Sequence, residues 1–238
     1  MHLSEIWHSK KKDCRLSRIQ VTMAGISSLW QDDYWLLVMQ LYMRKPVGLK
    51  RMYSRQMVDL SIELHLPPSF IYEKMFDLRN GSTPFLSSLM QRYKDNPRRL
   101  RADAAKVRSM MGFSSASAFY DGVEVKETFE KDFRQIPHCE PLTPVALILV
   151  LDLYFRLTPI TMVASTPEVE ELARLIGVKA RVVEDVLNVY QIIDPYLNRQ
   201  EFMVTPLLQP CQQIWQRYGN GSIEQLAALA AQLRDYYA

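Results

Sequence analysis

The feature that most constrains this chain is an internal repeat with a spacing of 112 residues. Residues 153–187 align with residues 41–75 without a gap, and apolar residues recur at matching positions along the whole length. The clearest pairs are Leu153/Leu41, Tyr154/Tyr42, Arg156/Arg44, Leu172/Leu60, Ile176/Leu64, Val178/Leu66, Val183/Ile71 and Leu187/Met75. Unrelated segments rarely keep both register and apolar pattern over such a length. We interpret the repeat as an internal duplication of one helical module; two amphipathic segments aligned by chance are the alternative.

Residues 172–190 have the spacing of a helix-turn-helix unit. The small Ala173 falls in the first helix, Gly177 at the turn, and the apolar Val183 on the second helix. This pattern is typical of units that place a helix in a groove of DNA. In the earlier copy the pattern is weaker, because His65 stands in the place of Gly177.

The chain is therefore predicted to be all-α, with two tandem helix-turn-helix-like helical modules related by internal duplication. Its length accommodates two modules of about a hundred residues each. We divide it into a basic N-terminal segment, a first helical module, a connector and a second helical module, at residues 1–30, 31–111, 112–141 and 142–238 respectively.

Helix boundaries follow from prolines, capping residues and apolar periodicity. The first module is predicted to hold helices at 30–44, 56–64 and 67–79 and one that starts at Pro97, and the connector a short helix at 126–134. In the second module we expect helices that open at Thr143-Pro144 and at Thr166-Pro167, one after Gly177, and two more at 208–218 and 222–237. Ser222 and Gln225 have the spacing of a capping box.

The two halves of the chain carry opposite charge. Residues 1–111 hold 19 Lys/Arg and 10 Asp/Glu, whereas residues 112–238 hold 10 Lys/Arg and 16 Asp/Glu. A basic half favours an anionic partner, for which double-stranded DNA is the leading candidate. The acidic half suggests a protein partner. An unevenly charged, solvated surface is the alternative to both.

Three groups of cations are candidate DNA contacts. A basic arm at the N-terminus, a stripe on the helix after Pro97 and the start of the second module's recognition helix contribute Lys10, Lys11, Lys12, Arg98, Arg99, Arg101, Lys106, Arg108, Lys179 and Arg181. Arg98, Arg101 and Arg108 recur at helical spacing and are expected to follow a phosphate backbone. In the first copy, Ser69, Tyr72 and Lys74 are expected nearest the groove.

Composition argues against several other classes of protein. The scattered cysteines and histidines, Cys14, Cys139, Cys211, His2, His8, His65 and His138, lack the paired spacing of a metal site. We find no glycine-rich phosphate loop and no nucleophile elbow, so neither a cofactor nor an enzymatic activity is expected. No apolar run reaches the roughly 20 residues that span a bilayer, and Met1–Lys12 lacks the features of a secretory signal. We expect a cytoplasmic protein without a membrane partner.

The second module resembles a known family. Leu153-Tyr154, Pro159, the run from Thr166 to Gly177, Val182-Val183, Leu187-Asn188 and Ile193-Asp194-Pro195 are similar to the helical region that precedes the nuclease domain in some bacterial HNH restriction-type endonucleases. Gln213-Ile214-Trp215 also fits, and the first module resembles the same pattern more faintly. The resemblance covers about 55 residues and implies association with DNA. The nuclease itself is absent, because the histidines needed for its metal and base are not grouped.

Together these patterns predict a non-catalytic DNA-binding protein, a regulator or an accessory subunit of a restriction-like or mobile-element system. The alternative is a protein-protein interaction module that keeps the helix-turn-helix shape without binding DNA. Glu184 and Asp185 lie on the recognition helix, where phosphates would approach, and they favour this alternative. A continuous positive surface that joins residues 92–108 to a recognition helix would favour DNA.

Overall fold

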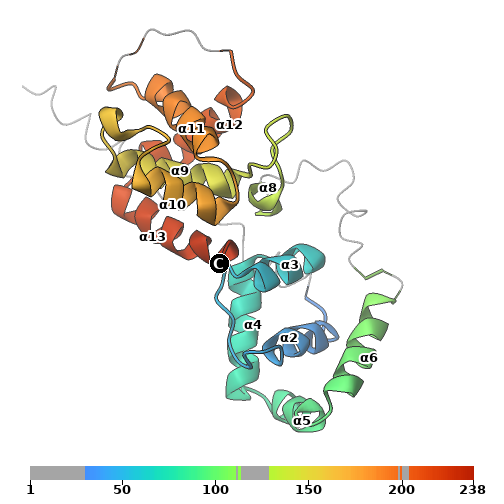
Figure 1. Ribbon diagram of the computed structural model, residues 1–238. Helices are drawn as coiled ribbons and strands as arrows, with labels where there is room; N and C mark the ends of the chain where they lie inside the picture. The colour runs from blue at the N-terminus through green and yellow to red at the C-terminus, as the bar shows by residue number, and fades with distance from the viewer. Residues whose placement is uncertain (1–29, 111, 114–128, 198, 200–203) are drawn as a thin grey trace, which may run out of the picture.

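The computed structural model describes residues 30–110, 112–113, 129–197, 199 and 204–238. Within these ranges the chain forms eleven α-helices and three short helical turns, and no strand, so the predicted all-α class is confirmed. The helices gather into two lobes that follow one another along the chain (Figure 1). None of the described helices has both the length and the hydropathy to cross a membrane.

The first lobe contains five helices around one apolar core. They are α2 (Tyr34–Tyr42), α3 (Arg55–Leu64), α4 (Pro68–Asn80), α5 (Pro84–Tyr93) and α6 (Pro97–Arg108). Helix α2 is central, because it packs against α3, α4 and α6, while α5 joins α4 to α6. Val38 and Met39 of α2, Met57 of α3 and Met75 of α4 have no exposed surface and mark the centre of this core.

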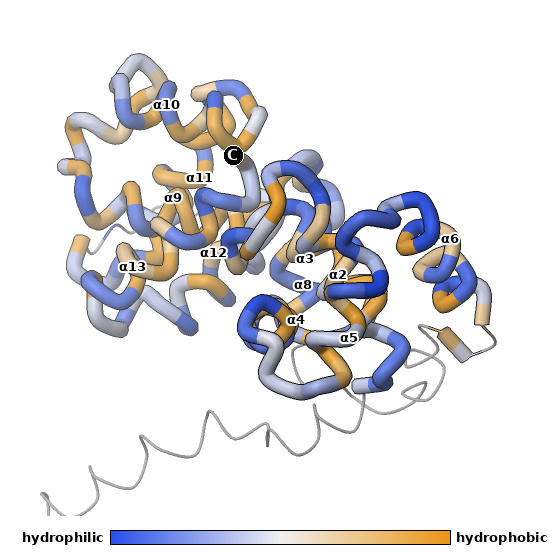
Figure 2. The backbone as a smooth tube through the Cα atoms, turned by 90° about the horizontal axis from the view of Figure 1, so that it is seen from below, coloured by the Kyte–Doolittle hydropathy of each residue, from blue (hydrophilic) through white to orange (hydrophobic). Residues whose placement is uncertain are grey.

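The second lobe is built around its own first long helix. Its elements are α8 (Glu130–Phe133), α9 (Pro144–Arg156), a 3-10 turn (Pro159–Thr161), α10 (Pro167–Ile176), α11 (Ala180–Ile193), α12 (Leu208–Ile214), a π-helical turn (Trp215–Gly219), α13 (Ile223–Leu233) and a second 3-10 turn (Arg234–Tyr236). Helix α9 packs against α8, α10, α11, α12 and α13. Every residue from Val145 to Tyr154 is buried. The hydrophobic stretches of α9 and α11 accordingly lie inside this lobe (Figure 2).

Several helix boundaries differ from the prediction. Helix α2 is shorter than the predicted 30–44, and the helix predicted at 126–134 is seen as the single turn α8, residues 126–128 of that prediction lying outside the described residues. The cationic segment 92–108 is divided, since α5 ends before Pro97, whose ring cannot continue a helix. The segments 208–218 and 222–237 each end in a tighter or wider turn instead of continuing as α-helix.

Side-chain hydrogen bonds cap the starts of α5, α9 and α13. The hydroxyl oxygen of Thr143 accepts the backbone N–H of Ala146 at 3.2 Å, as its capping role predicts. Ser222 likewise accepts from the backbone N–H of Gln225 at 3.3 Å, which is one half of the predicted capping box. Thr166 is different, because its hydroxyl donates to the carbonyl of Thr161 at 2.6 Å and caps no helix N–H.

Helices α3 and α10 end in the same way. His65 and Gly177 both adopt the left-handed conformation, with φ of 55° and 75°. In each case the next backbone N–H returns to the helix: Leu66 donates to Ser61 at 3.0 Å, and Val178 donates to Ala173 at 2.9 Å. This bond satisfies a carbonyl that the helix end would leave unpaired.

When helices are counted from α2 in the first lobe and from α9 in the second, the second and third helices of the two lobes keep a constant spacing in sequence. Helix α10 begins and ends 112 positions after α3, and α11 begins 112 positions after α4. The fifth helices follow a different spacing of 126 positions, which aligns the buried residues Leu100/Leu226, Ala104/Ala230 and Val107/Leu233. In both lobes the first helix packs against the second, third and fifth, and the second packs against the third.

Helix α3 connects the lobes. Val58 on α3 is fully buried in the core of the second lobe. The ring of Tyr53 stacks on Phe133 at 6.4 Å, and Phe133 meets Tyr236 at 5.0 Å. At the end of α3, Nδ1 of His65 lies 2.8 Å from the carboxylate of the buried Glu130. The junction therefore combines an apolar contact with a hydrogen-bonded acid.

Mutation of a buried leucine on α6 and on α13 tests the packing of the two cores. We expect Leu100→Ala and Leu226→Ala each to lower the free energy of unfolding by about 2–5 kcal/mol, because each deletes a buried side chain and leaves a cavity. Urea denaturation followed by circular dichroism measures both effects. Gln232→Ala, at an exposed position of α13, serves as the control and should change stability by less than about 0.5 kcal/mol. An effect as small as the control's for either leucine would contradict this packing.

Candidate nucleic-acid interface

Helix α6 carries half of the predicted DNA-binding residues. Its buried side faces α2 through Leu100, Ala104 and Val107. The cations Arg98, Arg99, Arg101 and Lys106 are exposed on the other sides of the helix, and Arg108 is partly buried. Lys10, Lys11 and Lys12 lie outside the described residues.

No acid among the described residues pairs with the guanidinium groups of Arg98 and Arg101. Among the described residues, Arg98 makes no hydrogen bond or ion pair, and Nε of Arg101 donates to the carbonyl of Pro97 in its own helix at 3.4 Å. The two residues are three positions apart, so they lie on neighbouring ridges of one helix face. Their charge is available to an anion.

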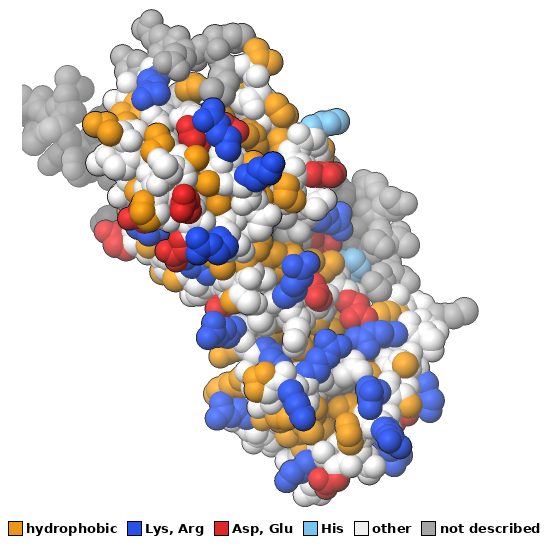
Figure 3. Space-filling view, in the orientation of Figure 1, with side chains coloured by type: hydrophobic (Ala, Val, Ile, Leu, Met, Phe, Trp, Pro, Cys, Tyr) orange, Lys and Arg blue, Asp and Glu red, His pale blue; other side chains and the backbone are white. Residues whose placement is uncertain are grey.

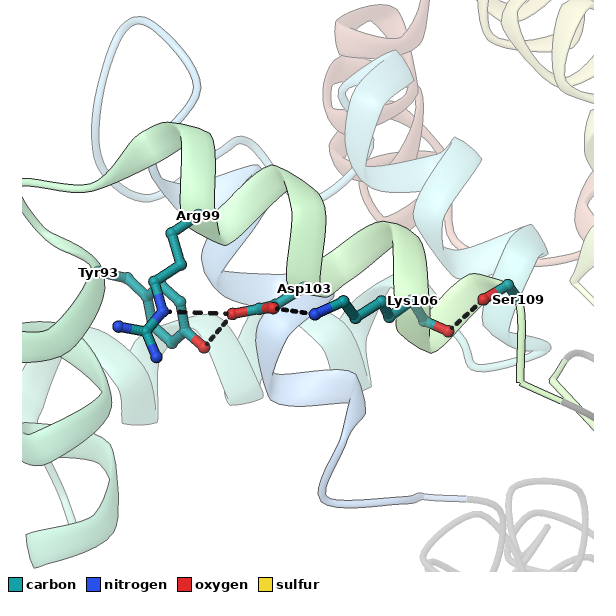
Figure 4. Close-up of polar contacts among 5 residues, drawn as sticks. All are labelled: Tyr93, Arg99, Asp103, Lys106 and Ser109. Carbon is teal, nitrogen blue, oxygen red and sulfur yellow. Dashed lines mark hydrogen bonds and ion pairs between the residues drawn. The ribbon is translucent and has the colours of Figure 1, made fainter.

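Arg99 and Lys106 share one acid, Asp103 (Figure 4). Nζ of Lys106 donates to Asp103 at 3.2 Å, and Nε of Arg99 lies 3.7 Å from the same carboxylate. The hydroxyl of Tyr93 on α5 also donates to it at 2.8 Å. The bond from Tyr93 holds the pKa of Asp103 below its ordinary value, and burial with this bond raises the pKa of Tyr93. The carboxylate of Asp103 partly neutralises both cations. The hydrogen bond from Tyr93 joins α5 to α6.

Arg108 does not extend the positive stripe, which corrects the sequence prediction. Its guanidinium turns back onto the first lobe, pairs with both carboxylate oxygens of Glu63 on α3 and donates to Gln40 on α2 at 2.9 Å. A two-point pair of this kind is strong and geometrically specific. Arg108 therefore stabilises the packing of α6 on α2 and α3, and its charge is neutralised inside the lobe.

Helix α11, which the sequence predicts as a recognition helix, presents little positive charge. Arg181 donates to Glu184 at 3.2 Å and lies 3.5 Å from Asp185, so both acids of its own helix neutralise it. Glu184 also accepts the backbone N–H of Ala164 at 3.0 Å, which fixes its carboxylate. Lys179 is exposed at the N-cap position. Of the two residues predicted to read bases together, only Lys179 therefore has a charge that no described acid neutralises.

Lys74 in the first lobe also differs from the prediction. Its ammonium lies 5.3 Å from the ring centre of Trp30, 5.5 Å from that of Trp35 and 5.2 Å from that of Phe70. Three rings at these distances attract the cation through their π faces. Lys74 is thus held against rings of its own lobe, and the matching position of the second lobe is the buried Val186.

The positive surface belongs to the first lobe. The described part of residues 30–113 holds 14 Lys/Arg and 8 Asp/Glu, whereas that of residues 129–238 holds 9 and 12. Figure 3 shows Lys and Arg side chains spread over the visible face of the first lobe, with acids more frequent among them on the second. Helices α6 and α11 lie in different lobes, far from each other (Figure 1).

No candidate metal or catalytic centre emerges from the described residues. They contain no group of three or more His, Cys, Asp or Glu side chains placed to hold a metal ion. Cys139 and Cys211 are buried free thiols, and burial raises the pKa of Cys211 to about 12. A thiol with so high a pKa is a poor nucleophile at neutral pH.

Comparisons with models of known protein families, with curated proteins and with solved structures give no match to this chain. The resemblance to the region before an HNH nuclease domain consequently stays a prediction that rests on the motif residues.

The different surroundings of Arg108 and Arg98 can be tested by mutation. We expect Arg108→Met to lower the free energy of unfolding by about 1–3 kcal/mol, because Glu63 loses its charged hydrogen-bond partner. Arg98→Met removes the same charge from a solvated position and should change stability by less than about 0.5 kcal/mol. Urea denaturation of both variants gives the comparison. Equal decreases in stability would mean that the contacts of Arg108 with Glu63 and Gln40 contribute no more to folding than the solvated side chain of Arg98 does.

Proposed function

We propose that this is a cytoplasmic, non-catalytic DNA-binding protein whose first lobe lies on the phosphate backbone. The observation that carries the proposal is the pair of exposed guanidinium groups of Arg98 and Arg101 on α6, with which no acid in the described part of the chain pairs. An excess of Lys/Arg over Asp/Glu in the same lobe adds a favourable field for a polyanion. Phosphate contacts of this kind supply affinity that depends on salt but carry no sequence information.

Backbone contact fits the surroundings of the other cations better than base reading does. Lys74 is held by aromatic rings and Arg181 by two acids, so α4 and α11 offer few donors to base edges. Base discrimination depends on such donors placed in the major groove. We therefore propose binding to duplex DNA with little preference for sequence, and Lys179 as a minor contact.

We further propose that the two lobes arose by duplication of one helix-turn-helix-like module. The equal spacing of α3/α10 and α4/α11 supports this, as do the left-handed residues His65 and Gly177 at matching positions. The motif resemblance to the region that precedes HNH nuclease domains supports a role as a regulator or an accessory subunit of a restriction-like or mobile-element system.

A protein-interaction module is the second candidate. The neutralised Arg181 and the acidic excess of the second lobe favour it, because a recognition helix without free cations can keep its packing role alone. In this alternative the second lobe binds a partner protein and the first lobe provides a basic surface in solution.

Fluorescence anisotropy with a labelled DNA duplex at several salt concentrations tests the proposal. We expect Arg98→Gln combined with Arg101→Gln to weaken binding to any duplex. The slope of log affinity against log salt should become shallower by about 0.9 for each phosphate that the variant no longer neutralises.

The matched control is Lys179→Gln combined with Arg181→Gln, which removes the same charge from the second lobe. Its binding should stay close to that of the wild-type protein, since Arg181 is already neutralised. Two results would overturn the proposal: absence of wild-type binding at low salt, where attraction is least screened, or an equal decrease in affinity in the two double variants.

A further inference from the structure

The second lobe contains a cavity of about 420 Å³ between α9, α10 and α13. Its charged lining residues are Asp152, Arg156, Glu168, Glu171 and Arg234, and Ala227 and Ala231 form part of its wall on α13. Three carboxylates face two guanidinium groups, so the lining carries an excess of negative charge.

The first lobe has a smaller cavity of about 210 Å³ at the corresponding place, between α2, α3 and α6. Six lining positions correspond at the helix spacings of 112 and 126 residues: Gln40/Asp152, Leu41/Leu153, Arg44/Arg156, Gln56/Glu168, Asp59/Glu171 and Arg108/Arg234. The two cavities are therefore one feature of the five-helix lobe, which occurs twice.

In the first lobe, an arginine on the cavity wall is held by acceptors of the same lobe. Arg108 pairs with Glu63 and donates to Gln40 at 2.9 Å. The carboxylate of Glu63 on α3 and the side-chain amide oxygen of Gln40 on α2 thus accept hydrogen bonds from one planar cation, the guanidinium group of Arg108 on α6.

The cavity of the second lobe lacks this arrangement. Leu175 stands at the position that matches Glu63, so Arg234 has no equivalent acid and lies 3.9 Å from Glu171 instead. Asp152 is paired with Arg156 at 2.9 Å. Among the described residues Glu168 forms no ion pair or hydrogen bond, which leaves it and the loosely paired Glu171 at the edge of a wider space.

We propose that the cavity of the second lobe binds an arginine side chain of a partner protein, with Glu168 and Glu171 as its acceptors. A guanidinium group presents parallel N–H donors that match carboxylate oxygens, as Arg108 and Glu63 illustrate at other positions of the first lobe. This inference goes beyond DNA binding and uses a different lobe and the opposite charge.

Nuclear magnetic resonance with ¹⁵N-labelled protein tests the inference. The probe is the peptide acetyl-Ala-Leu-Arg-Leu-Ala-amide, and its counterpart with citrulline in place of arginine keeps the shape without the charge. We expect the arginine peptide to shift the amide signals of Ala227 and Ala231 in a saturable way. The citrulline peptide should bind about tenfold more weakly, the factor that corresponds to one charge-assisted hydrogen bond.

Two pairs of variants locate the site. Ala231→Leu narrows the cavity and should weaken binding, whereas Ala228→Leu, at an exposed position of α13 outside the cavity, should not. Glu168→Gln with Glu171→Gln should weaken binding about tenfold, and Glu170→Gln with Glu140→Gln, which removes the same charge elsewhere, should not. Circular dichroism confirms that each variant is folded.

The proposal is overturned if the arginine peptide gives no saturable shift, if citrulline binds equally well, or if Ala231→Leu binds like the wild-type protein. Duplex binding provides an independent readout. The cavity variants should leave it unchanged, and the Arg98/Arg101 variant should bind the peptide normally, so the two proposals fail or succeed separately.

Discussion

Burial of the first helix of each lobe is the constraint on which the rest of the structure depends. Helix α9 is apolar almost all round, and such a helix has to be covered by other elements on every side. Its one buried acid, Asp152, is neutralised one turn later by Arg156 at 2.9 Å. Tyr190 of α11 donates its hydroxyl to the backbone carbonyl of Leu147 at 3.0 Å, so even the polar groups at the centre are paired. Once α9 and α2 are enclosed, the positions of the second, third and fifth helices follow.

Two enclosed helices give two cores, and α3 is the element that belongs to both. One side of α3 packs on α2 and α4, while Val58 enters the second core. Glu130, which is buried at the same junction, has one oxygen at His65 and the other 3.0 Å from Arg134. A buried carboxylate is costly unless it is paired on both sides, so this arrangement ties the connector to the end of α3. The lobes consequently have separate interiors and a specific polar link.

The sequence predicts the helices well because their ends depend on local chemistry. Thr143, Pro97 and the left-handed residues His65 and Gly177 act on the backbone within a few residues. The surroundings of the cations could not be predicted in the same way. Arg108 finds Glu63 across 45 positions, and the rings around Lys74 come from two separate segments, so their partners depend on how the helices pack. Arg181 is an intermediate case, because acids three and four positions later on a helix are recognisable competitors for its charge.

The spacing between corresponding helices changes from 112 positions at the third helix to 126 at the fifth. This change indicates where the fold tolerates a longer connecting segment. Helix α5 follows α4 after three residues, whereas α12 starts at Leu208, well beyond the end of α11 at Ile193. The fifth helix nevertheless returns to the same place on the first, with the same three buried positions. The segment between the third and fourth helices is therefore where this architecture accepts additional sequence. Insertions there, such as a fused domain or a label, should leave the packing of both lobes intact.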